Sequence, residues 1–187
     1  MAQKTSDQAL WVFAYGSLLW NPGIPVATQQ RATLHGYRRA FCMDSVHYRG
    51  TEEAPGLVLA LDHAPGRSCE GVAYQVAPEH RDQALDYLRE RELVTSAYLE
   101  TWLDVALTDG SARHAVTYVI DPSHAQYRGH MSLQDQAQVI ARARGRAGCN
   151  RSYLENTLAS LADLEIPDPE LSELGQLVAE VTARLDV

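Results

Sequence analysis

Apolar residues in the first part of the chain come in short runs broken by glycine and proline. The clearest runs lie at residues 11–20, 57–62 and 71–76. Two later runs, around 99–107 and 116–120, are separated by Asp109-Gly110, a dipeptide that favours a tight turn between antiparallel strands. The pattern therefore predicts several short strands and one β-hairpin.

The apolar spacing changes after Pro78. Between residues 80 and 94, Leu85, Leu88 and position 92 lie three and four residues apart, which places them on one helical face. We therefore predict a helix here.

The last third of the chain has helical signals. Ser132 and Asp135 have the spacing of a capping box, Asn150 can cap a second helix, and Asp168-Pro169 can begin a third. One side of the third helix is apolar, with Leu171, Leu174, Val178 and Val181. Strands, a helix, a hairpin and then helices predict a mixed α+β fold rather than a doubly wound sheet.

Length and charge narrow the picture. We expect one domain over residues 1–187, with a flexible N-terminus at 1–10, because 187 residues suit a single core. With 24 acidic and 16 basic residues, the net charge of -8 disfavours nucleic acid and anionic membranes as partners. The sequence leaves the oligomeric state open.

The cysteines and the absence of targeting segments predict a cytoplasmic protein. Cys42, Cys69 and Cys149 are odd in number and widely spaced, which fits a reducing compartment better than a disulfide framework. Residues 1–10 are polar, and no apolar run has the length of a signal peptide or a membrane span.

Glu92 is the first candidate for chemistry, because it shares a helical face with Leu85 and Leu88. A carboxyl buried without a cationic partner has a raised pKa and can act as a base near neutrality. The alternative is that Glu92 belongs to the charged run 89–92 at a solvated helix end.

Two further segments are candidates for ligand binding. Tyr15-Gly16-Ser17-Leu18 follows an apolar strand, and its successive backbone N–H groups could hold an anion, although an ordinary turn would look the same. Residues 145–154 place Tyr153 in the first turn of a helix, where it could reach a pocket or serve as a core aromatic. The seven histidines lack metal-ligand spacing, so we predict no metal.

Taken together, several ordered motifs resemble the ChaC family of γ-glutamylcyclotransferases over nearly the whole chain. They are Trp11 to Pro22, Arg49-Gly50, Pro55-Gly56, Glu70 to Tyr74, Arg91-Glu92 and Gly145 to Leu154. The resemblance implies a small mixed β-barrel flanked by helices and a cofactor-independent lyase that converts glutathione to 5-oxoproline and Cys-Gly.

The resemblance also implies roles for individual residues. Glu92 matches the catalytic acid-base, at one cavity with the 15–18 loop. The residues that match the binding site for the γ-glutamyl group are Phe13, Ala14, Tyr15, Gly16, Ser17, Leu18 and Tyr153. The chain departs from the family pattern at Ala14, Arg146, Ser96-Ala97 and residues 43–48. A cyclotransferase for other γ-glutamyl amino acids or amines, and a non-catalytic binder of γ-glutamyl peptides, are the alternatives.

Overall fold

The computed structural model describes residues 9–185, which form two compact units. The barrel unit contains the described residues up to Arg39 and Leu61–Asp121, and the helical unit contains Ala40–Ala60 and the described residues from Pro122 onward. The single domain expected from the sequence stays a prediction. Of the expected flexible N-terminus, residues 1–8 lie outside the described part, whereas Leu10 is fully buried and begins a strand.

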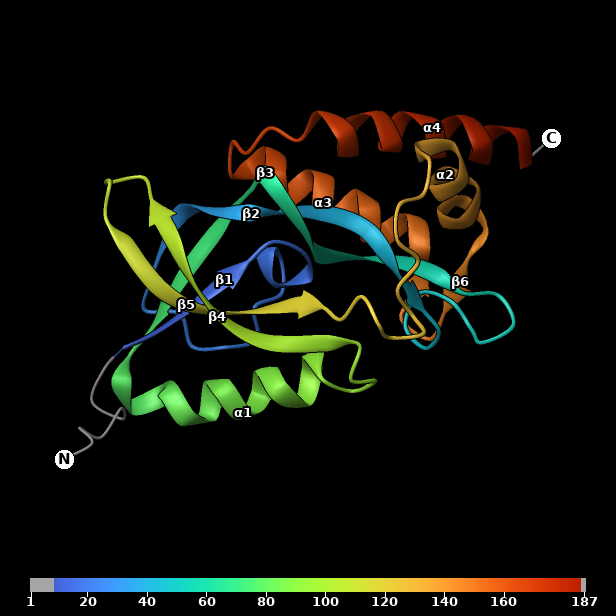
Figure 1. Ribbon diagram of the computed structural model, residues 1–187. Helices are drawn as coiled ribbons and strands as arrows, with labels where there is room; N and C mark the ends of the chain where they lie inside the picture. The colour runs from blue at the N-terminus through green and yellow to red at the C-terminus, as the bar shows by residue number, and fades with distance from the viewer. Residues whose placement is uncertain (1–8, 186–187) are drawn as a thin grey trace. The chain divides into compact units, whose positions relative to one another are not determined.

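Five strands form a closed β-barrel with the order β1-β3-β2-β4-β5 (Figure 1), and the end of β2 and the start of β3 belong to the helical unit. The strands are β1 (Leu10–Ala14), β2 (Thr28–Ser45), β3 (Gly56–Val76), β4 (Tyr98–Leu107) and β5 (Ala112–Ile120). β1 pairs antiparallel with β3 and parallel with β5, which closes the barrel. The β4–β5 hairpin turns at Asp109-Gly110 as predicted, and Gly110 has a φ of +84°. The expected mixed α+β barrel is confirmed.

Burial explains why the central strands read as continuous apolar runs. Every residue of β5 from Ala115 to Ile120 is buried, as expected for a strand covered on both faces.

β3 lies very close to β1 at Gly71, where a Cβ atom would stand 2.2 Å from the carbonyl oxygen of Ala14. Only glycine permits this approach.

The sequence pattern predicted a strand over residues 11–20, but the structure divides this run into two elements. β1 ends at Ala14, and a 3₁₀ helix, η2 (Ser17–Leu19), follows. The reason is local: Gly16 adopts φ −134° and ψ −127°, which lies outside the strand region.

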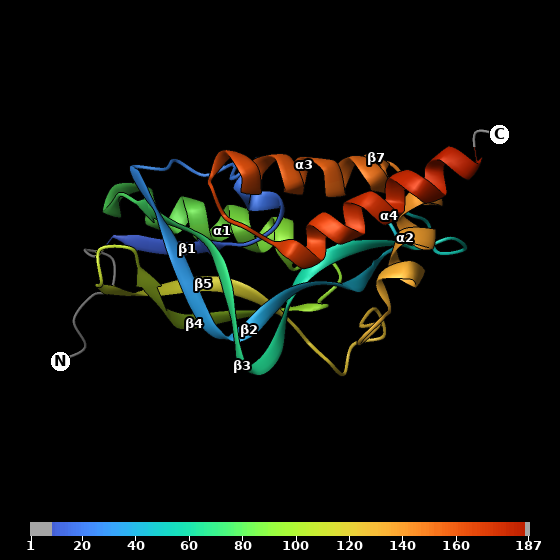
Figure 2. The same ribbon diagram turned by 90° about the horizontal axis from the view of Figure 1, so that it is seen from above.

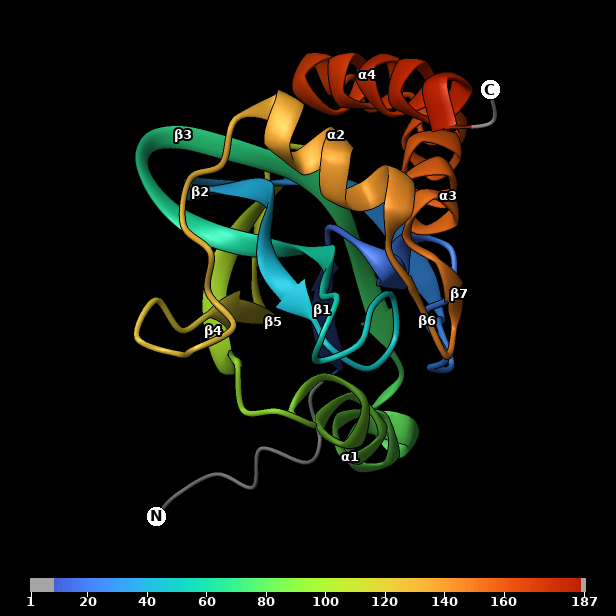
Figure 3. The ribbon, with the colours of Figure 1, turned by 90° about the vertical axis from the view of Figure 1, so that its right-hand side faces the viewer.

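Helix α1 (Arg81–Glu92) follows the 3₁₀ turn η3 (Pro78–His80) and confirms the helix predicted after Pro78. It runs alongside the barrel strands of its unit (Figures 1 and 3). Leu85 and Leu88 are buried, and Glu92 is the last helical residue.

The helical unit contains α2 (Leu133–Arg142), α3 (Asn150–Asp163) and α4 (Pro169–Leu185), which pack against one another (Figure 2). A short hairpin of β6 (Arg144–Gly145) and β7 (Gly148–Cys149) precedes α3. The predicted cap of α2 is confirmed, since Ser132 Oγ accepts a 3.1 Å hydrogen bond from Asp135 N. The predicted apolar side of α4 is buried as well.

The expectation that Asn150 caps a helix is wrong. Cys149 occupies the N-cap position, and Asn150 is the first residue of α3. The Asn150 side chain is fully buried and pairs with the backbone of Leu57, accepting from its N–H at 2.6 Å and donating to its carbonyl at 2.7 Å. An amide does this well because it offers a donor and an acceptor side by side.

Candidate active site

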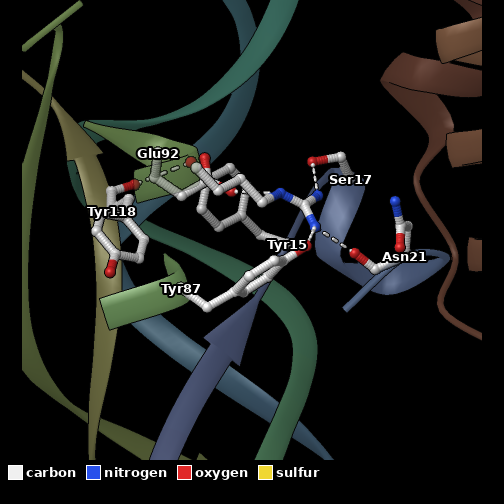
Figure 4. Close-up of polar contacts among 7 residues, drawn as sticks. Tyr15, Ser17, Asn21, Tyr87, Glu92 and Tyr118 are labelled. Carbon is white, nitrogen blue, oxygen red and sulfur yellow. Dashed lines mark hydrogen bonds and ion pairs between the residues drawn. The ribbon is translucent and has the colours of Figure 1, made fainter. Parts of the chain in front are cut away.

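The predicted binding segment begins in the barrel wall. Phe13 and Ala14 are fully buried at the end of β1, so they position the segment from inside the core. Tyr15 is also buried, and its hydroxyl donates a 2.9 Å hydrogen bond to the backbone carbonyl of Tyr118 in β5 (Figure 4). The ring of Tyr15 is therefore fixed by the neighbouring strand β5.

A buried arginine holds the backbone of the same segment. Arg39 in β2 is only 9% exposed, and its Nη1 donates to the carbonyl of Tyr15 at 2.6 Å. Its Nη2 donates to the carbonyl of Glu70 in β3, also at 2.6 Å. One guanidinium thus joins the start of the loop to two other barrel strands.

The next three residues leave backbone donors available. Tyr74 Oη donates a 3.1 Å hydrogen bond to the carbonyl of Leu18. This bond anchors η2 without using any of its backbone N–H groups. Within residues 9–185, the N–H groups of Gly16, Ser17 and Leu18 donate no hydrogen bond. Adjacent N–H groups of this kind can receive a carboxylate or an oxyanion.

Glu92 lies at the C-terminal end of α1, and its side chain is only 15% exposed. The interpretation as a solvated helix end does not fit this burial, whereas Glu90 next to it is exposed. Burial raises the pKa of Glu92, and the neighbouring Arg91 guanidinium opposes part of that increase. The carboxyl therefore has the environment of a base that works above the usual range of a glutamate.

Arg91 brings Glu92 and the loop together. Figure 4 labels its partners Glu92, Ser17 and Asn21. Its Nε lies 3.1 Å from Glu92 Oε1, and its Nη2 donates to Ser17 Oγ at 2.9 Å. Its Nη1 donates to the carbonyl of Asn21 at 2.5 Å. The structure thus places two of the predicted site residues, Ser17 and Glu92, on the same guanidinium.

Tyr118 adds a polar group beside Glu92. Its hydroxyl is buried and has no hydrogen-bond partner of ordinary geometry among residues 9–185. Burial, followed by the charges of Glu100 and Glu92, raises the pKa of Tyr118, so the hydroxyl stays protonated near neutral pH. This hydroxyl interacts with the carboxylate of Glu100 in β4.

Tyr153 belongs to the helical unit and is described within it. It is 7% exposed, and its ring packs edge-on against Phe41 with centroids 5.9 Å apart. Arg49 lies over the ring at 5.6 Å. These contacts fit a core aromatic, and the role of Tyr153 in substrate binding stays a prediction.

Neither a metal cluster nor a membrane-spanning helix is found in the described part of the chain. No group of three or more histidine, cysteine, aspartate or glutamate side chains there could hold a metal ion. No helix within residues 9–185 is long and apolar enough to cross a bilayer.

Sequence reasoning missed Arg39, Tyr118 and the bridging role of Arg91. Arg39 stands beside Arg38 in a strand pattern, and nothing in its spacing shows that it points inward. In the sequence, Arg91 belongs to a charged run and to the family motif Arg91-Glu92, and neither assigns it a contact with the loop. Its position directly before a glutamate that shares an apolar helical face was the available signal.

Comparison with known proteins points to one family. Residues 10–183 match the family described as ChaC-like protein. The glutathione-specific γ-glutamylcyclotransferase of Escherichia coli K12 is 37% identical over 183 residues, covering 98% of this chain and 78% of the relative. Human glutathione-specific γ-glutamylcyclotransferase 1 is 34% identical over 183 residues, covering 95% and 81%. The crystal structure of a yeast γ-glutamyl cyclotransferase specific to glutathione shares the fold, with a TM-score of 0.83, 24% identity and coverage of 92% and 96%.

Proposed function

Because the chain belongs to the ChaC family, we propose that it is a cytoplasmic lyase that converts glutathione to 5-oxoproline and Cys-Gly. The observation that carries this proposal is the burial of Glu92 on the guanidinium that also holds Ser17. Its relatives named glutathione-specific γ-glutamylcyclotransferase support the choice of substrate.

The reaction is an intramolecular acyl transfer. The α-amine of the γ-glutamyl group attacks its own γ-amide carbonyl carbon, a C–N bond forms to close the five-membered ring, and the C–N bond to cysteine breaks. Glu92 takes a proton from the α-ammonium group to free the attacking amine and passes it to the departing cysteine nitrogen. A second proton leaves the attacking nitrogen as the new C–N bond forms and follows the same route, so cysteine departs as an ammonium group and the ring nitrogen keeps one hydrogen. Atoms and charges balance without water or a cofactor.

The pKa of Glu92 decides how costly the first proton transfer is. With ordinary pKa values of about 4.3 for glutamate and about 8 for an α-amine, the transfer is uphill by roughly 3.5 units, or about 5 kcal/mol. Burial of Glu92 raises its pKa and narrows this gap. The retained Arg91 contact keeps the carboxylate form accessible.

The remaining task is to fold the substrate so that its amine meets its carbonyl. The N–H groups of Gly16, Ser17 and Leu18 are the donors for the substrate carboxylate or for the developing oxyanion. Phe13 and Ala14 fix the start of this segment. Tyr153 is included in the proposed binding site through the family resemblance.

Release of 5-oxoproline tests the proposal. The purified chain is mixed with glutathione, and separately with γ-glutamyl-alanine, and 5-oxoproline is quantified after each incubation. Turnover of glutathione well above that of γ-glutamyl-alanine is expected. The reverse preference would indicate a cyclotransferase for other γ-glutamyl compounds. Binding of glutathione without any 5-oxoproline would indicate a non-catalytic binding protein.

A further inference from the structure

Arg91 makes more directed contacts than an ion pair with Glu92 requires. We propose that Arg91 is a positioning residue that fixes the base Glu92 and the segment from Ser17 to Asn21 in one hydrogen-bonded unit. This inference rests on the proposed function, because it assigns Arg91 a part in the same reaction.

The geometry uses all three nitrogens of the guanidinium. Nε faces Glu92 Oε1 at 3.1 Å, Nη2 donates to Ser17 Oγ at 2.9 Å, and Nη1 donates to the carbonyl of Asn21 at 2.5 Å. The N–H of Asn21 donates back to the carbonyl of Ser17 at 3.0 Å, so both contacts on the loop belong to one turn. A lysine ammonium lacks the planar fork needed to reach these partners together.

Arg91 also contacts Tyr87, which packs against a residue beyond the loop. Arg91 Nη1 also donates to the hydroxyl of Tyr87 at 3.5 Å, one helical turn earlier in α1. That hydroxyl lies where a side chain at residue 23 would begin, since a Cβ on Gly23 would stand 2.1 Å from it. α1 therefore contacts the loop both through Arg91 and through Tyr87 against Gly23.

Two effects of Arg91 on Glu92 can be separated. The positive charge of Arg91 favours the carboxylate form of Glu92 and opposes the increase in its pKa that burial causes. The hydrogen bonds of the planar guanidinium hold the carboxylate in place relative to Ser17. Tyr118 from β5 also interacts electrostatically with Glu92, and its hydroxyl lies near Glu100 of β4, which pairs with Arg89 of α1. Arg91 is the cation that contacts Glu92 and acts on its pKa.

The test compares two variants. Arg91→Met removes both the positive charge and the planar guanidinium group, whereas Arg91→Lys keeps the positive charge and removes only the guanidinium group. Arg81→Met, at the start of the same helix, is the matched control. kcat and KM for 5-oxoproline release from glutathione are measured across pH, with thermal unfolding of each variant. We expect Arg91→Met to lower kcat/KM about 10²-fold, as for a misplaced catalytic group, and to move the acid limb to higher pH.

Arg91→Lys separates position from charge. We expect kcat/KM to fall about 10-fold or more while the acid limb stays near that of the wild type. Wild-type kcat/KM in Arg91→Lys would overturn the positioning role, and this variant alone decides the question if Arg91→Met does not fold. Wild-type kinetics in Arg91→Met would overturn the inference as well.

A second measurement needs no turnover. The pKa of Glu92 is followed by carbon NMR of its carboxyl in the wild type, Arg91→Met and Arg81→Met, without substrate. An increase only in Arg91→Met is expected, and an unchanged pKa would refute the contact between the two side chains. If the wild type releases no 5-oxoproline but the NMR result holds, the proposed function fails and the link between Arg91 and Glu92 stands.

Discussion

Oε1 of Glu92 lies 3.1 Å from Nε of Arg91, its immediate neighbour in the chain. Consecutive residues point in different directions around a helix, and this contact is possible because Glu92 is the final residue of α1. The carboxyl is therefore under two opposing influences, since burial raises its pKa and the guanidinium limits the increase. A group in this balance can both accept and return a proton.

Substitution of Glu92 by glutamine is expected to abolish most turnover. Glutamine keeps the size of the side chain but cannot take the proton from the substrate amine. We expect kcat to fall by about 10² to 10⁴, the range attributed to general acid-base catalysis, with KM little changed. Exposed Glu90→Gln, two residues away, should retain wild-type kcat. A folded Glu92→Gln protein with normal 5-oxoproline release would overturn the mechanism.

The difference in unfolding free energy between Glu92→Gln and the wild type is also expected to depend on pH. Because the pKa of Glu92 is raised in the folded state, the protonated carboxyl stabilises the fold below the unfolded pKa, and this contribution is lost as pH rises through the folded pKa. Glu92→Gln does not titrate there. Its unfolding free energy should therefore increase relative to that of the wild type as the pH rises above the usual pKa of a glutamate, about 4.3.

Denaturant unfolding of both proteins at several pH values measures this difference. Glu90→Gln serves again as the control, because its parent carboxyl is exposed. A constant difference between Glu92→Gln and the wild type across these pH values would show that the carboxyl has an ordinary pKa.

Tyr15 and Ser17 should respond differently to the loss of their hydroxyls. The hydroxyl of Tyr15 is buried against the carbonyl of Tyr118, so Tyr15→Phe leaves a buried acceptor unpaired and should cost about 1–3 kcal/mol of unfolding free energy. Ser17 is partly exposed and accepts from Arg91. Ser17→Ala should change stability by less than about 1 kcal/mol yet lower kcat/KM.

Thermal unfolding and glutathione kinetics of the two variants make the comparison. If Ser17→Ala kept full kcat/KM, the loop contact with Arg91 would have no part in the reaction. A Tyr15→Phe protein as stable as the wild type would show that its hydroxyl bond contributes nothing to the barrel.

In the helical unit, the prediction concerns Asn150. Its replacement by alanine removes both partners of the buried backbone of Leu57. With two groups left unsatisfied at about 1–3 kcal/mol each, we expect a loss of roughly 2–6 kcal/mol. Asn156→Ala, at an exposed position of the same helix, should stay within about 0.5 kcal/mol of the wild type. Similar urea midpoints for the two variants would contradict the structural role of Asn150.

Local sequence signals account for the secondary structure better than for the site. The spacing of Leu85 and Leu88 correctly predicted α1, and Asp109-Gly110 correctly predicted the hairpin, because both depend on residues a few positions apart. The inward direction of Arg39 and the partner of Asn150 depend on strands far away in the chain. Such contacts leave no periodic pattern.

In the candidate site, too, the sequence indicated the residues involved but not the contacts between distant segments. The family motifs identified Glu92 and the segment from Phe13 to Leu18 as candidates, whose roles stay predictions. Spacing alone could not decide between a solvated and a buried Glu92, because burial at a helix end depends on what packs there. The structure supplies the missing part through Arg91, which connects two segments more than seventy residues apart.

The pairing of Asn150 with Leu57 has a consequence for synthesis on the ribosome. These residues are 93 positions apart, so the segment Ala40–Ala60 emerges long before the helices that complete its unit. Phe41, Leu57 and Leu59, nearly fully buried in the finished protein, must remain without their final partners during that interval. A nascent chain stalled before residue 150 is therefore expected to attract chaperones that recognise apolar segments, because this unit can fold only once its helices have been synthesised.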